Sequence, residues 1–306
     1  MNLKRIFLAS FGAVAAVAAV PAGAALNWNF ANGTGNCTAS TNAGCWGNTI
    51  TRTSTGGSTN FSATAEAYSS TGTGGVIQDA YLASWSGGLG VANRNTNSVD
   101  PNEGTPRATT APEHSIDSQG TNAVTTTNGT GAVYDSVLFA FANAVTLTQV
   151  TLGWAAYDSD ISVLAWVGPG SPPTGTNALD LGSKTYASLV SSGWALVGNY
   201  MDVAGTPAQS AGGSSGTYTT LINGAANADN TTGSAVYSSQ YWLVGAYNPV
   251  FDGSSWTAGN DFVKLSSVAG VKTPDRKVPE PASAALVALS VCGVLAMRGR
   301  RRQMAR

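Results

Sequence analysis

The chain is poor in charged residues, which make up 10% of its 306 positions, with 15 basic and 16 acidic side chains. A typical soluble protein carries about 25% charged residues. A nucleic-acid-binding protein needs a basic stripe to neutralise phosphates, and the near-balance of charge excludes that class of partner. The scarcity of Lys, Glu and Arg also disfavours a coiled coil or a helical bundle.

Catalytic residue types are scarce as well. The single histidine, His114, leaves one base for a histidine-dependent catalytic site, and the sequence contains no HExxH motif, P-loop or Rossmann glycine pattern. Residues 212–216 match GxSxG, but they lie in a Gly/Ser-rich run that predicts a loop rather than a nucleophile elbow. Glu66, Glu103 and Glu113 lie in polar sequence, which predicts solvated loop carboxylates rather than a glycosidase pair.

Turn-forming residues are abundant instead, including 37 glycines, and the 43% hydrophobic content can still form a core. Short apolar runs separated by turn signals predict β-strands at residues 76–82, 89–92, 133–141, 145–154, 161–167, 194–197 and 241–247. A register shift is expected at Thr148 and Gln149. No long amphipathic helix is expected, so the predicted fold class is all-β, a jelly-roll-like β-sandwich.

The basic residues gather at the two ends of the chain, and the first group precedes an apolar segment. Lys4 and Arg5 are followed by an apolar run over residues 6–20 and by small residues at 22–24. A basic start, an apolar stretch and a small-residue exit are the parts of a secretory signal peptide, predicted over residues 1–24. Export by the Sec machinery and cleavage by signal peptidase are therefore expected.

The second group follows an apolar segment at the other end. Residues 282–297 carry no charge and would span about 24 Å as a helix at ~1.5 Å per residue. Four arginines follow, and they predict a stop-transfer signal: Arg298, Arg300, Arg301 and Arg302. A single transmembrane helix is therefore expected, with the body outside the inner membrane and the tail inside.

The residues before this predicted helix are Val278, Pro279, Glu280 and Pro281. Followed by the apolar helix and the Arg-rich terminus, this motif resembles the PEP-CTERM sorting signal of exosortase-processed bacterial surface proteins, over residues 278–306. The resemblance implies an exosortase-type enzyme as partner and a transient anchor in the inner membrane. It also implies a final location at the cell surface or in an extracellular matrix of biofilm and exopolysaccharide.

The remaining body, residues 25–277, is predicted to be one exported domain. It contains eight basic and fifteen acidic residues, a net charge of −7. Segments within it are similar to the core pattern of a group of exosortase-dependent surface proteins: 114–117, 134–141, 150–154 and 158–161. This second resemblance implies a surface role and no particular activity.

Two cysteines lie in the body, in a segment rich in Gly, Asn and Thr. Cys37 and Cys45 are eight positions apart and are expected in an oxidising compartment, so a local disulfide is predicted. Metal binding by two cysteines without nearby histidines is disfavoured. The disulfide is expected to hold the loop beside Trp46.

An acidic turn precedes one of the predicted strands. Asp158 and Asp160 offer alternating oxygen ligands of the kind that bind Ca²⁺, and Asp117 and Asp135 are candidates to join them. Aspartates also cap turns through hydrogen bonds to their own backbone. Both interpretations, a calcium site and a capped turn, remain open from the sequence, and no other cofactor is expected.

The eight tryptophans fall into two groups. Four lie in apolar runs and are predicted core residues: Trp154, Trp166, Trp194 and Trp242. Four lie in polar surroundings, where they either pack in loops or stack on sugar rings: Trp28, Trp46, Trp85 and Trp256. Of these, Trp28 and Trp256 are the predicted glycan contacts.

Together these features predict a non-enzymatic protein of the cell surface or extracellular matrix, exported and then processed by an exosortase. One alternative is a carbohydrate-binding, lectin-like module, with extracellular polysaccharide as partner. A glycan hydrolase is the third interpretation, and loss of polysaccharide turnover on mutation of Glu113 would favour it.

Overall fold

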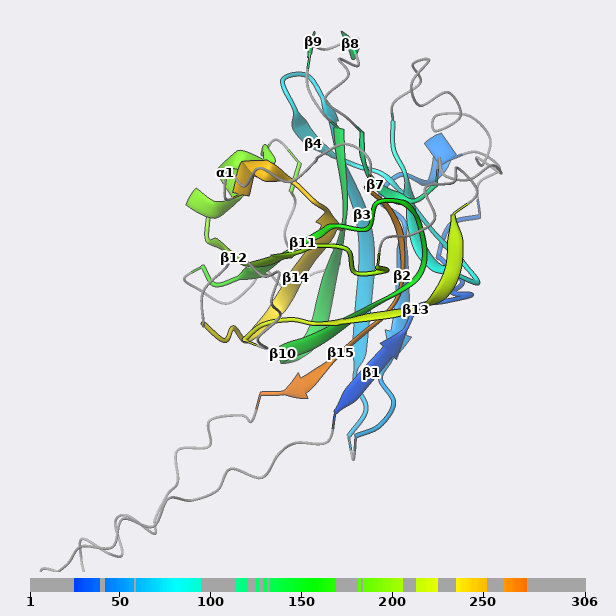
Figure 1. The fold of residues 1–306 in the computed structure, drawn as a ribbon, viewed down its shortest axis with the longest axis vertical. Helices are drawn as coiled ribbons and strands as arrows, with labels where there is room; N and C mark the ends of the chain where they lie inside the picture. Colours follow the sequence, from blue (N-terminus) through cyan, green and yellow to red (C-terminus); the bar gives the residue numbers. More distant parts are fainter. Residues whose placement is uncertain are drawn as a thin grey trace, which may run out of the picture.

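A computed structural model describes residues 25–38, 42–57, 59–94, 114–119, 125–126, 129–130, 133–168, 181–182, 184–205, 213–224, 235–251 and 261–273. Strands account for 62% of the structure and helices for 6%, which confirms the all-β class (Figure 1). The predicted signal peptide and sorting signal lie outside these residues. Within the described ranges no helix has the length and apolar character needed to cross a membrane.

The strands follow one another along the chain with few helical interruptions. The first seven are β1 (Leu26–Asn29), β2 (Thr49–Thr53), β3 (Ser62–Gly72), β4 (Val76–Asp79), β5 (Tyr81–Trp85), β6 (Gly88–Ala92) and β7 (Ile116–Gln119). The others are β8 (Thr125–Thr126), β9 (Gly129–Thr130), β10 (Val133–Tyr157), β11 (Ile161–Trp166), β12 (Trp194–Tyr200), β13 (Ser214–Leu221), β14 (Ser239–Ala246) and β15 (Asp261–Lys272). The helical elements are η1 (Asn42–Cys45), α1 (Tyr186–Ser191) and η2 (Pro249–Phe251).

The 25-residue strand β10 organises the main sheet, because its two halves have different neighbours. Its first half, from Ser136 to Ala140, lies between β3 and β14 (Figure 1). Its second half, from Gln149 to Tyr157, pairs with β13 and β15. A register shift with β15 falls between Leu147 and Gln149, which confirms the shift predicted there from the sequence.

Two sets of strands therefore share β10. In the first set β11 joins β14 to β12, while β2 and β4 pair with β3. In the second set β15 pairs with β1, β6 and β7, and β5 pairs with β6. All these strands form one hydrogen-bonded network of thirteen, and β8 and β9 form a separate pair.

The largest hydrophobic cluster draws side chains from both sets of strands. Val137, Phe139 and Phe141 lie in it, as the predicted alternation along β10 requires, and Leu138 lies in a second cluster on the other side. The predicted core tryptophans Trp154, Trp194 and Trp242 are buried, and Trp166 is partly buried against the second cluster.

The short helix α1 covers the second cluster with its two buried side chains, Tyr186 and Leu189. A capping box begins this helix. The Thr185 hydroxyl accepts a hydrogen bond from the Ser188 N–H, and the Ser188 hydroxyl accepts one from the Thr185 N–H. Within the described part of the body, α1 is the longest helical element, with six residues.

Two of the longest strands were not predicted from the sequence. The strand β3 reads SATAEAYSSTG and is mostly buried, although it carries few large apolar side chains. It pairs with β10 on one side and with β2 and β4 on the other, so its backbone is satisfied by neighbours from distant parts of the chain. The strand β15 is likewise central to the second set.

Candidate functional site

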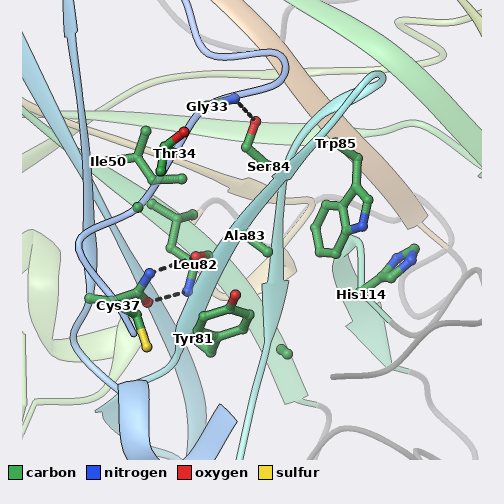
Figure 2. Close-up of a pocket in the computed structure, with 13 residues that line it drawn as sticks. Gly33, Thr34, Cys37, Ile50, Tyr81, Leu82, Ala83, Ser84, Trp85 and His114 are labelled. Carbon is green, nitrogen blue, oxygen red and sulfur yellow. Dashed lines mark hydrogen bonds between the residues drawn. The ribbon is translucent and has the colours of Figure 1, made fainter. Parts of the chain in front are cut away.

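A cleft lies between residues 33–37 and strand β5, and its volume is about 420 Å³. Figure 2 shows the side chains that form its walls. The lining combines aromatic, small and uncharged polar residues: Gly33, Thr34, Gly35, Cys37, Asn48, Ile50, Tyr81, Leu82, Ala83, Ser84, Trp85, Ala92 and His114.

Strand β5 places three cleft residues on one side of the sheet. Tyr81, Ala83 and Trp85 alternate with Leu82 and Ser84, so they project from the same face of the strand. In Figure 2 the two aromatic side chains stand toward opposite ends of the strand with Ala83 between them. The cleft therefore has aromatic ends and a small residue at its centre.

The facing strand β6 supplies small residues where these side chains need space. Ala83 pairs with Gly90, and Trp85 pairs with Gly88. A Cβ atom at Gly90 would lie 1.9 Å from the His114 carbonyl oxygen and 2.9 Å from Cζ3 of Trp85. Glycine at this position therefore lets Trp85 and residue 114 approach the sheet closely.

Hydrogen bonds fix the opposite wall to β5. The Gly33 N–H donates to the Ser84 hydroxyl at 2.7 Å. The Asn48 side chain donates to the Leu82 carbonyl at 2.7 Å and accepts from the Leu82 N–H at 2.7 Å. Asn48 and Ser84 thus act mainly as structural ties between the wall and the strand.

A disulfide joins Cys37, at the end of this wall, to Cys45 at the end of η1. The two Cα atoms are 5.6 Å apart, within the usual range for a disulfide. The disulfide was predicted to hold this loop beside Trp46. The Trp46 side chain is partly buried in a small cluster that contains both cysteines. The Arg94 guanidinium lies over the Trp46 ring at 4.2 Å from its centroid.

Trp85 stacks with His114, and their ring centroids lie 4.2 Å apart. The ammonium group of Lys264 lies 4.6 Å from the centroid of the Trp85 ring and 5.0 Å from that of Trp154. Burial, together with the charge of Lys264, lowers the pKa of His114 to about 4. Burial also lowers the pKa of Lys264 to about 8. The imidazole in the cleft is consequently neutral at neutral pH.

A second cluster contains the two aspartates predicted to bind calcium. Ligand oxygens of Asp158, Asp160 and Asp261 all lie within 4.8 Å of one another. Asp261 accepts hydrogen bonds from the Ser118 hydroxyl at 2.7 Å and from the Asp160 N–H at 3.0 Å. Burial raises the pKa of Asp160 to about 7 and the pKa of Asp261 well above its usual value.

The structure thus extends the predicted acidic pair by a residue that no local pattern indicates. Asp261 lies 101 positions from Asp160 and begins strand β15. Asp117 and Asp135 are buried, but neither belongs to the group of described carboxylates gathered within 4.8 Å. Backbone capping also occurs here, because the Asp158 carboxylate accepts a hydrogen bond from the Ser159 N–H. Features of both the calcium site and the capped turn are therefore present.

The prediction that Trp28 contacts glycan is wrong. Its side chain is 0% exposed, and its indole N–H donates to the Phe61 carbonyl at 3.0 Å. The ring packs edge-on against Phe61 and Phe141, because β1 is a paired strand rather than a polar loop. The other predicted glycan contact, Trp256, lies outside the described residues.

Glu66 and the serine of the GxSxG match both lie in β-strands. Glu66 was predicted in a solvated loop, but it lies in strand β3 and is buried, so that prediction is wrong. Residues 214–216 of the GxSxG match lie in strand β13, so the predicted loop is wrong for them. The strand continues to Leu221 without a strand-to-helix turn. Glu103 and Glu113 lie outside the residues that the structure describes.

Sequence reasoning included Trp85 among the tryptophans that could meet sugar, but it did not identify the cleft. The alternation of Tyr81, Ala83 and Trp85 was a local signal for it. Only the tertiary structure shows that Thr34 and His114 line this cleft and that Lys264 contacts the Trp85 ring. No family model, curated protein or solved structure matches the chain.

Proposed function

We propose that the chain is an exported, non-catalytic protein of the cell surface or extracellular matrix, released from its membrane anchor by an exosortase-type enzyme. The observation that carries this proposal is the paired arrangement of a charge-free segment and a basic group at each end of the sequence. The body between them has a net charge of −7 and is rich in small polar residues, a composition suited to a hydrated polysaccharide matrix.

The proposed architecture of the body is a jelly-roll-like β-sandwich. Support comes from the two sets of strands that share β10 and from the large cluster to which both contribute. Phe139 from the first half of β10 and Leu152 from the second half both lie in this cluster. A sandwich is built from two layers of strands that pack on a common core, and we assign the two sets to those layers.

The state of His114 supports a non-catalytic role. A general base works best when its pKa is close to the operating pH. The pKa of His114 is lowered to about 4, chiefly by burial, so its basicity is weak at neutral pH. The ring is also held against the indole of Trp85.

Replacement of Pro279, Glu280 and Pro281 by alanine tests the sorting proposal. In a host that carries the sorting enzyme, we expect the variant to accumulate uncut in the membrane fraction. Pro274→Ala, a few residues upstream, is the matched control and should be processed normally. Release of the triple variant at the normal size would contradict the proposal.

A second candidate function, carbohydrate binding, is favoured by the cleft beside β5. Its aromatic ends and uncharged polar lining have the character of a small-molecule site. This function is compatible with the first, because a surface protein of a polysaccharide matrix has saccharides as neighbours. The two functions are tested by separate experiments.

A further inference from the structure

We propose that the cleft between residues 33–37 and β5 binds an uncharged sugar ring of a polysaccharide, with Trp85 and Tyr81 as its aromatic walls. This inference rests on the proposed association of the body with polysaccharide. It assigns that association to a site and to a chemical class of ligand.

The size of the cleft fits a small polar ligand. Binding sites for small molecules usually occupy about 300–1,000 Å³, and this cleft has a volume of about 420 Å³. Its lining mixes apolar carbon with hydroxyl, amide and backbone groups. A sugar ring has the same dual character, with C–H groups on its faces and hydroxyl groups at its edge.

The charge of the lining favours a neutral ligand over an anionic one. Among the thirteen residues drawn in Figure 2 there is no aspartate, glutamate, lysine or arginine. Strong sites for carboxylate or phosphate use charged donors such as Arg or Lys. His114 does not supply such a charge at neutral pH, since burial favours its neutral form. Lys264 contacts the Trp85 ring but does not line the cleft.

The aromatic side chains stand at a spacing that suits a ring between them. Tyr81 and Trp85 are four residues apart on one face of a strand, a Cα separation of roughly 13 Å at ~3.3 Å per residue. Ala83 lies between them and leaves room above the strand. An indole face or edge can pack against the C–H face of a sugar, and Thr34 offers an exposed hydroxyl at the rim.

The geometry of the site is fixed before a ligand arrives. The His114 ring and the Lys264 ammonium restrain Trp85. The Asn48 and Ser84 hydrogen bonds and the disulfide of Cys37 restrain the opposite wall. Preorganisation of this kind lowers the entropy cost of binding.

The test uses the full chain purified in detergent and an array of immobilised neutral hexasaccharides (glucans, mannans and galactans), with alginate hexasaccharides as the anionic comparison. We expect retention of at least one neutral series and weaker retention of alginate. Trp85→Ala should weaken the affinity by about tenfold or more, through loss of the aromatic wall. Thr34→Arg, on the exposed rim, should weaken it by blocking the entrance while leaving the unfolding temperature unchanged.

Tyr157→Ala is the matched control, because Tyr157 is an exposed aromatic residue that does not line the cleft. It should bind as the unmodified chain does. If Trp85→Ala fails to fold, Thr34→Arg decides the outcome. The proposal is overturned if no neutral series is retained, if alginate binds as tightly, or if the folded cleft variants bind normally. None of these binding results depends on cleavage at Pro279–Pro281. Failure of the sorting proposal would therefore be seen in the processing experiment and not in this binding assay.

Discussion

The imidazole ring of His114 packs on the indole ring of Trp85, with 4.2 Å between centroids and 40° between ring planes. This contact connects the segment before β7 with the end of β5 and forms one end of the cleft. Lys264 reaches the same indole from β15, so three separate parts of the chain meet there. The protonation state of His114 therefore reports directly on the integrity of this site.

The first prediction concerns that protonation state. Burial and the Lys264 charge lower the pKa of His114 from 6.5 to about 4, so NMR titration of this only histidine should give a value near 4. Lys264→Met should raise the pKa without restoring 6.5, because burial remains the larger cause. Lys272→Met, elsewhere on β15, is the control. A value near 6.5 in the unmodified protein would show that the ring is not buried as described.

The same shift affects stability with a defined sign. Between about pH 4 and 6.5 the folded state binds fewer protons at His114 than the unfolded state does. The contribution of His114 to the free energy of unfolding therefore falls as the pH decreases through that window. An uncharged substitute such as His114→Gln should reduce this part of the pH dependence. Urea unfolding at several pH values between 4 and 6.5 measures the difference.

A second prediction concerns Asp135, whose pKa is raised to about 7 by burial, although a hydrogen bond from Asn93 opposes the shift. The folded state therefore binds more protons than the unfolded state between about pH 4 and 7, and stability from this group is lost as the pH rises. The asparagine side chain of the Asp135→Asn variant is uncharged at every pH in this range. Its free energy of unfolding relative to the unmodified chain should increase from pH 4.5 to 7.5, on the order of a few kcal/mol.

Asp79→Asn is the control for this experiment, because Asp79 is partly exposed in a surface ion pair with Arg94. Surface ion pairs contribute only about 0–1 kcal/mol, so its relative stability should change little with pH. Equal pH profiles for Asp135→Asn and the unmodified chain would mean that the Asp135 carboxyl is solvated or already ionised.

A third prediction follows from the calcium hypothesis for Asp158 and Asp160. If Asp261 completes that site, Ca²⁺ should raise the unfolding temperature, and a chelator should reverse the effect. Free Ca²⁺ at about 100 times its Kd would add ~2.7 kcal/mol to the free energy of unfolding. Asp261→Asn should abolish the response and Asp79→Asn should preserve it. An unfolding temperature insensitive to Ca²⁺ leaves the capped turn as the explanation of these aspartates.

A fourth prediction concerns Trp28 as a core residue. Trp28→Ala should lower the free energy of unfolding by about 3–5 kcal/mol, because it removes a fully buried indole and leaves a cavity. Trp28→Phe should cost less, since it keeps a ring against Phe61 and Phe141. Denaturant unfolding measures both values. A loss below about 1 kcal/mol for Trp28→Ala would be inconsistent with this burial.

The sequence was informative wherever large apolar residues alternate. The two faces of β10 and β11 follow from that alternation, and Ile161, Val163 and Ala165 lie in one cluster with Leu164 in the other. The register shift near Thr148 was also predicted, because the alternation changes phase there. Local patterns of this kind are sufficient when a strand has one large apolar side chain on every second position.

Local pattern was insufficient where burial comes from distant pairing. Strand β3 is built mainly from Ala, Ser and Thr, and its burial arises from three neighbouring strands. Asp261 meets Asp160 only because β15 returns beside the end of β10. The polar surroundings of Trp28 in the sequence likewise gave no sign that β1 pairs with β15.

The central claim, export followed by sorting, is tested most directly by mass spectrometry of the mature protein isolated from its native envelope. We expect an N-terminus near Ala25 and a C-terminus near Pro279–Pro281, with the Arg-rich tail absent. A mature protein that retains residues 1–24, or that ends at Arg306, would show that export and sorting do not occur as proposed.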